Sequence, residues 1–154
     1  MNDKSTTIPT IWYRWLVAVC TITTIFALLL VVAPGLFHST LGEITYNSFF
    51  DNNEYAHLSD AELSYQDWML GVLGATMIGW MLAISWLLFG PFRRGEQWSW
   101  NAITAAIVVW YILDTGTSLA HGVVFNAFFN SGFLFMFGIP LVATFRHFHL
   151  RAHE

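Results

Sequence analysis

Four long apolar segments dominate the sequence and decide what it can fold into. They run from about residue 11 to 33, 68 to 89, 98 to 117 and 123 to 145, and a helix needs about 20 residues to cross a bilayer. Inside lipid the backbone must satisfy its own hydrogen bonds, which a helix does within a single segment. The sequence therefore predicts an all-α integral membrane protein, a bundle of four transmembrane helices that forms one domain over residues 1–154.

The composition agrees with this class and excludes several others. Hydrophobic residues make up 56% of the chain and charged residues only 10%, whereas soluble domains carry about 25% charged residues. Six Lys and Arg residues are too few for a basic patch that binds nucleic acid. A single cysteine, Cys20, excludes an internal disulfide or a CxxC redox centre. The expected partners are membrane lipids and other membrane protein chains or a second copy of this chain, with no nucleic acid.

The positions of the cationic residues predict the orientation. They lie at the N-terminal end, between the second and third apolar segments, and after the fourth: Lys4, Arg14, Arg93, Arg94, Arg146 and Arg151. With four spans these three places share one side of the membrane, and cytoplasmic segments carry an excess of Lys and Arg. We therefore expect a multi-pass protein of a bacterial inner membrane with both termini in the cytoplasm.

The connection between the first two spans, residues 34–66, then faces outward. It mixes acidic and apolar residues and contains no Lys or Arg, which favours short helices lying on the membrane face. The Asp51–Asn53 stretch is a turn signal. Ser59 and Glu62 have the spacing of a capping box, so the second helix is expected to begin near Asp60.

Small residues mark one helix as a packing surface. In the second apolar segment Gly71, Ala75 and Gly79 are spaced four apart, with Gly74 beside them. Small side chains let a neighbouring helix approach closely, which matters where lipid supplies no hydrophobic drive between helices. We expect this surface to pack within the chain, and the alternative is that it dimerises two copies.

Asp114 is the only carboxylate inside the long apolar segments. It follows Trp98 by sixteen residues, about 24 Å along a helix, so it is expected near the outer edge of the hydrocarbon. An ionisable residue inside a membrane span often has a functional role, and it usually interacts with a polar or charged partner. His121 is the predicted partner, and Asn126 and Asn130 share one helix face. These four residues form a candidate ligand-binding site. The alternative is a structural clasp between two helices.

A divalent metal site on the outer side is a weaker alternative. His38, His57 and His121 share that side with several carboxylates, a donor set that suits zinc, but their spacing matches no ligand motif. Haem ligation would need histidines inside facing spans, and the apolar segments contain none. No other cofactor is predicted.

Three classes of function follow from these patterns. The first is an accessory or structural subunit that packs with other membrane proteins, which the lack of a deep polar site favours. The second is a carrier or binder of a small or lipidic ligand in an outward-facing polar pocket around Asp114. The third is a metal-dependent membrane enzyme at the outer face, and the sequence favours an enzyme less than either of the others.

Overall fold

The computed structural model describes residues 8–50 and 55–149, and this part of the chain is helical without strands. Four of its helices are long and apolar enough to cross a membrane, as predicted. They are α1 (Thr10–Val32), α3 (Asp60–Leu87), α4 (Gln97–Ala120) and α5 (Val124–His149). A helical turn, η4 (Leu88–Phe92), continues α3 toward α4.

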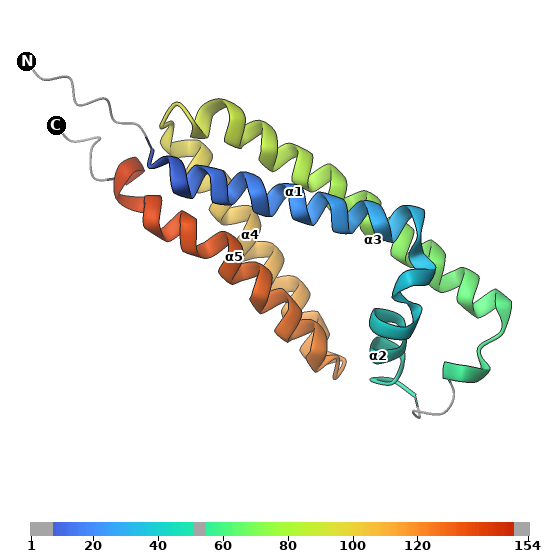
Figure 1. Ribbon diagram of the computed structural model, residues 1–154. Coiled ribbons are helices and arrows are strands. Elements are labelled where there is room, and N and C mark those ends of the chain that lie inside the picture. Colours follow the sequence, from blue (N-terminus) through green and yellow to red (C-terminus); the bar gives the residue numbers. More distant parts are fainter. Residues whose placement is uncertain (1–7, 51–54, 150–154) are drawn as a thin grey trace, which may run out of the picture.

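The long helices pack as two antiparallel pairs (Figure 1). Helix α1 packs along α3, α4 packs along α5, and the two pairs meet mainly through α1 and α5. Helices α3 and α4 barely touch, and the pairs diverge toward the turn between α4 and α5. The separation between the two pairs is therefore greatest at the end of the molecule that carries this turn (Figure 1).

Close packing of α1 on α3 depends on one glycine. A Cβ atom added at Gly74 would lie 2.5 Å from the backbone oxygen of Ala27, closer than any real contact allows. Around Gly71 and Gly79 an added Cβ would meet nothing within 4 Å, and Ala75 is exposed. Of the four predicted packing residues, only Gly74 therefore lies in a tight interface within the described chain. The other three share a line along the helix that turns away from α1.

A proline in α5 creates a contact between α1 and α5. Pro140 lies inside the helix and has no N–H, so it cannot bond the carbonyl four residues back. That carbonyl belongs to Met136, and the indole Nε1 of Trp15 donates to it at 3.0 Å. The acceptor freed by the proline thus becomes an attachment point for α1.

The connection between α1 and α3 contains short helices, as predicted. They are η1 (Pro34–Phe37), η2 (His38–Gly42), α2 (Glu43–Tyr46) and η3 (Tyr55–His57). Two side-chain contacts hold the connection to α3: His38 Nε2 lies 2.6 Å from Asp67 Oδ1, and the Tyr55 hydroxyl donates to Gln66 Oε1 at 3.0 Å. The expected Asp51–Asn53 turn lies outside the described residues.

The first turn of α3 has the predicted capping box. The Ser59 backbone N–H donates to Glu62 Oε2 at 2.7 Å, and the Glu62 N–H donates to Ser59 Oγ at 3.4 Å. Two N–H groups that lack helical partners are thereby satisfied. This start at Asp60, well before the apolar run, extends α3 beyond the predicted span.

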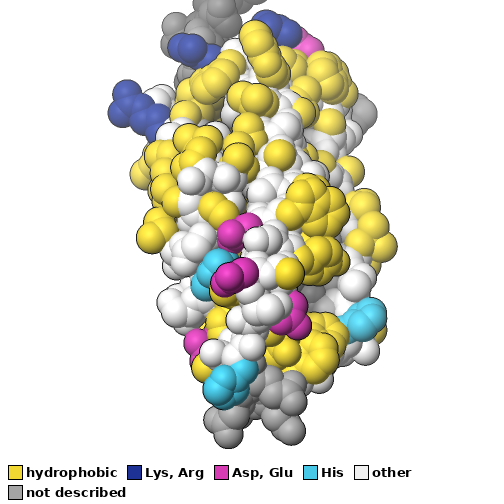
Figure 2. Space-filling model, turned by 90° about the vertical axis from the view of Figure 1, so that its right-hand side faces the viewer, with side chains coloured by type: hydrophobic (Ala, Val, Ile, Leu, Met, Phe, Trp, Pro, Cys, Tyr) yellow, Lys and Arg dark blue, Asp and Glu magenta, His cyan; other side chains and the backbone are white. Residues whose placement is uncertain are grey.

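Charged and apolar side chains occupy different zones of the surface (Figure 2). Arginines gather at the end where α1 begins, α3 turns into α4 and α5 finishes, together with Glu96, His147 and His149. The other described acidic residues lie toward the other end with His38, His57 and His121. Large apolar side chains cover the zone between, and Trp86, Phe128 and Val142 are 76%, 75% and 75% exposed. Such a surface suits contact with lipid rather than water. Lys4 and Arg151 lie outside the described residues.

Replacing Gly74 with alanine is expected to lower the free energy of unfolding by about 1–3 kcal/mol, because the added methyl overpacks the contact with α1. Gly79→Ala is the matched control, since the same methyl meets open space. Alanine also favours a helix over glycine. Unfolding by SDS titration from mild detergent micelles measures both variants, and equal stabilities for the two would contradict a tight interface at Gly74.

Candidate functional site

A tight turn sets α5 against the end of α4. Helix α4 ends at Ala120 with His121 as its C-cap, and Gly122 follows with a φ of 78°, a conformation that glycine adopts without strain. Val123 N–H donates to the Ser118 carbonyl at 2.8 Å and Gly122 N–H donates to the Leu119 carbonyl at 3.1 Å. This pair of bonds is the Schellman pattern that closes helices. It reverses the chain within a few residues and so determines which residues of the two helices face each other.

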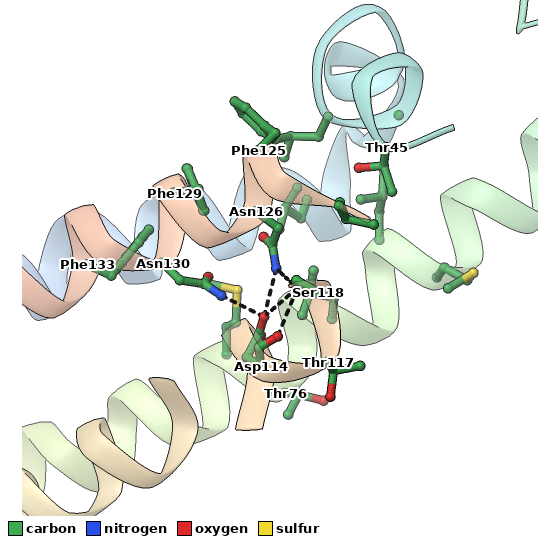
Figure 3. A pocket seen from close by; sticks show the side chains of 18 of the residues that line it. Thr45, Thr76, Asp114, Thr117, Ser118, Phe125, Asn126, Phe129, Asn130 and Phe133 are labelled. Atoms are coloured by element: carbon green, nitrogen blue, oxygen red, sulfur yellow. Dashed lines mark hydrogen bonds between the residues drawn. The ribbon is translucent and has the colours of Figure 1, made fainter. Parts of the chain in front are cut away.

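Asp114 lies at the centre of a polar cluster between α4 and α5 (Figure 3). The side-chain Nδ2 groups of Asn126 and Asn130 both donate to Asp114 Oδ1 at 2.7 Å. Asn126 Nδ2 also donates to Ser118 Oγ at 2.7 Å, and Asn130 Nδ2 to Thr115 Oγ1 at 3.2 Å. Ser118 Oγ in turn donates to the Asp114 carbonyl at 2.8 Å. We call these five residues the Asp114 cluster.

His121 does not join this cluster, although the sequence suggested it as the partner of Asp114. Its Nδ1 donates to the Thr117 carbonyl at 2.9 Å, and its ring centre lies 6.4 Å from that of Phe49. The expected pairing assumed that α4 continued through position 121, but the helix stops at Ala120. The histidine is therefore exposed at the turn.

Two members of the cluster, Thr115 and Ser118, were not predicted as site residues. Ser118 follows Asp114 by four residues, so it shares the same face of α4, and this spacing was a usable signal. Thr115 carried no such signal, because its role depends on where Asn130 approaches from α5. Both residues are buried, at 8% and 9% exposure, and Asn130 is 2% exposed.

A cavity of about 1350 Å³ lies between the two helix pairs, beside the Asp114 cluster. Residues of all four long helices line it, and so do Leu41, Tyr46 and Phe49 of the connection between α1 and α3. Most of the lining side chains are apolar. The polar end is formed by Asp114 and its neighbours, so the cavity is an apolar space with one polar end (Figure 3).

Aromatic rings along the cavity connect the helix pairs. Phe26 of α1 lies 5.9 Å from Phe129 of α5, and Trp80 of α3 lies 5.5 Å from Trp110 of α4, measured between ring centres. Trp110 also contacts Phe133 of α5 at 6.2 Å. These ring contacts set the spacing between the helices that line the cavity and give the cavity an aromatic lining.

The candidate metal ligands are dispersed. His38 is paired with Asp67, His57 is exposed on η3, and His121 bonds the backbone at the α4–α5 turn. Within residues 8–50 and 55–149, no group of three or more His, Cys, Asp or Glu side chains is arranged to hold a metal ion. The three histidines are thus not brought together in the part of the chain that the structure describes.

Comparisons with known proteins add no functional residue to this site. No protein-family model, no curated protein and no solved structure matches the chain.

Replacing Asn130 with alanine is expected to lower the free energy of unfolding by about 1.5–3 kcal/mol, because a buried donor to a carboxylate is lost. The same substitution in an Asp114→Ala background should cost clearly less, since its acceptor is already absent. SDS titration of the four proteins in this cycle measures the coupling. His121→Ala serves as the control with little expected effect, and additive losses in the cycle would show that the two residues do not interact.

Proposed function

We propose that the protein binds an amphipathic, lipidic molecule in the cavity, with the polar end of the ligand at the Asp114 cluster. The observation that carries this proposal is the combination of a large apolar cavity with one polar end. Sites for small molecules commonly measure about 300–1,000 Å³ and pair apolar walls with a few placed polar groups. At about 1350 Å³, this cavity has room for a hydrocarbon chain as well as a head group.

The organisation of the Asp114 cluster supports a ligand-binding role in addition to a structural link between α4 and α5. A clasp between α4 and α5 would need only the bonds from the asparagines to Asp114 Oδ1. Asp114, Asn126 and Asn130 additionally line the cavity, and Asp114 and Asn126 are only half-buried, so a molecule inside the cavity would contact the cluster. Polar groups beside an apolar space are costly to leave without hydrogen bonds, and a ligand head group would supply them.

The four helices are further proposed to form a transmembrane bundle in a bacterial inner membrane, with both termini in the cytoplasm. The positive-inside rule supports this orientation, because the arginines of the described chain lie at one end of the molecule. The Asp114 cluster then lies near the outer surface. A ligand would enter from the outer leaflet or from the space outside it.

An accessory role in a larger membrane assembly is the second candidate. The observation in its favour is the small-residue line Gly71, Ala75 and Gly79, which is not covered tightly by any helix of the described chain. Small residues at helix surfaces allow close approach of a further helix. This line lies apart from the cavity, and none of the three residues lines it, so the two candidate functions can be tested separately.

Filling the cavity is expected to remove bound lipid. Ala106 lines the cavity, and Ala75 is exposed outside it, so Ala106→Phe and Ala75→Phe add the same bulk in two places. Native mass spectrometry of protein purified in mild detergent should show a bound lipidic molecule on the wild type and on Ala75→Phe, and at least about tenfold less on Ala106→Phe. Equal occupancy in all three proteins, or none in the wild type, would contradict the proposed function. Loss of a copurifying protein chain from Ala75→Phe alone would support the accessory role.

The orientation is tested with single cysteines. In a Cys20→Ala background, Ala56→Cys places a thiol on the outer connection and Gln97→Cys places one at the start of α4, and both positions are exposed. A membrane-impermeant maleimide added to intact cells should label Ala56→Cys and leave Gln97→Cys unlabelled until the cells are opened. The reverse pattern would place both termini outside.

A further inference from the structure

We infer that the head group of the ligand is a protonated amine, so that the protein selects lipophilic amines over neutral or anionic amphiphiles. This inference rests on the proposed function and adds the chemical class of the ligand. It follows from which hydrogen-bonding groups of the Asp114 cluster are already used and which remain available to a bound molecule.

The amide donors of the cluster are already used. Each asparagine Nδ2 has two hydrogens, and Asn126 uses both on Asp114 Oδ1 and Ser118 Oγ. Asn130 uses both on Asp114 Oδ1 and Thr115 Oγ1. The single hydroxyl hydrogen of Ser118 goes to the Asp114 carbonyl. A ligand therefore finds no free N–H group on the two asparagine side chains.

Acceptors, by contrast, remain available. Within the described residues, no hydrogen bond reaches Asp114 Oδ2 or the side-chain amide oxygens of Asn126 and Asn130. All three residues line the cavity. An ammonium group has three donors and no acceptor, so it complements three acceptors. A hydroxyl group would supply one donor, and a carboxylate or phosphate would supply none.

The charges around the cavity favour the same class. Among the described lining residues the carboxylates are Asp114 and Glu62, the one imidazole is His121, and there is no Lys or Arg. His121 uses its Nδ1 on the Thr117 carbonyl, and the described arginines lie toward the opposite end of the molecule. Charge strengthens a hydrogen bond, and the effect is larger where water is excluded. An anionic head group would meet the Asp114 carboxylate with no Lys or Arg beside it.

The size of the cavity favours a lipophilic amine over a metal ion. A metal ion would use the polar end alone and leave the apolar remainder without an occupant. An alkyl or isoprenoid chain on the amine would instead cover the apolar walls, and transfer of such a chain from water to an apolar space is favourable in proportion to the area buried. The geometry thus fits a single-chain amine whose nitrogen lies at Asp114.

Three probes with the same chain test the inference: dodecylamine, 1-dodecanol and dodecanoate. Each is titrated into the delipidated protein in nanodiscs. Binding is read from the change in total tryptophan fluorescence, since two of the eight tryptophans, Trp80 and Trp110, line the cavity, and from native mass spectrometry. Because ionic hydrogen bonds are about twice as strong as neutral ones, dodecylamine should bind at least about tenfold more tightly than dodecanol, and dodecanoate more weakly than either. In Asp114→Asn the preference for the amine over the alcohol should disappear while the alcohol still binds.

The controls separate failure of this inference from failure of the proposed function. Ala106→Phe should lose saturable binding of every probe, whereas Ala75→Phe should bind like the wild type. If all three probes bind equally and Ala106→Phe abolishes that binding, the cavity is a lipid site but the amine class is wrong. If Asp114→Asn keeps the full preference for the amine, the class is likewise wrong. If no probe saturates the wild type, the proposed function fails as well.

Discussion

The pair of hydrogen bonds from Asn126 and Asn130 to Asp114 Oδ1 is the interaction on which the packing near the α4–α5 turn depends. A carboxylate in a membrane-spanning helix is costly unless other groups of the protein solvate it. The two amides solvate one of its oxygens, and they can do so only while α5 keeps its register against α4. The Schellman turn at Gly122 supplies that register. The backbone turn at Gly122 and the need to solvate the Asp114 carboxylate thus favour the same packing of α5 on α4.

The cavity results from unequal packing of the helices. Gly74 brings α1 and α3 into close contact, and Trp15 links α1 to α5 through the carbonyl that Pro140 leaves free. Nothing comparable brings α3 and α4 together along their length. Bulky aromatic rings, including Trp80 and Trp110, stand between them instead. The space that remains adjoins the Asp114 cluster, so the same packing that builds the helix pairs also leaves the carboxylate beside the cavity.

The sequence correctly predicted features that depend on neighbouring residues along the chain. It predicted incompletely which side chains meet between helices, because that depends on how each helix is rotated about its axis. The four long apolar helices and the capping box at Ser59 follow from length, hydropathy and short-range hydrogen bonding, and all are present. The pairing of His121 with Asp114 was expected from helical spacing, but the helix ends one residue earlier. The small-residue line on α3 was expected to face a neighbouring helix, yet Gly74 alone does so closely, because which face of a helix turns inward is decided by the partners it meets.

The sequence by itself determined that the chain is helical, that four of its segments can cross a membrane, and that one carboxylate lies near the end of a span. These features follow from the need of a backbone in lipid to satisfy its hydrogen bonds internally and from the number of residues that span a bilayer. Only the tertiary structure decided that both asparagine amides are used on Asp114 and Ser118 or Thr115, that acceptors remain beside them, and that an apolar cavity adjoins them. Hydrogen-bond partners and empty space depend on how helices far apart in the sequence are rotated and spaced, and no local pattern of residues specifies that arrangement.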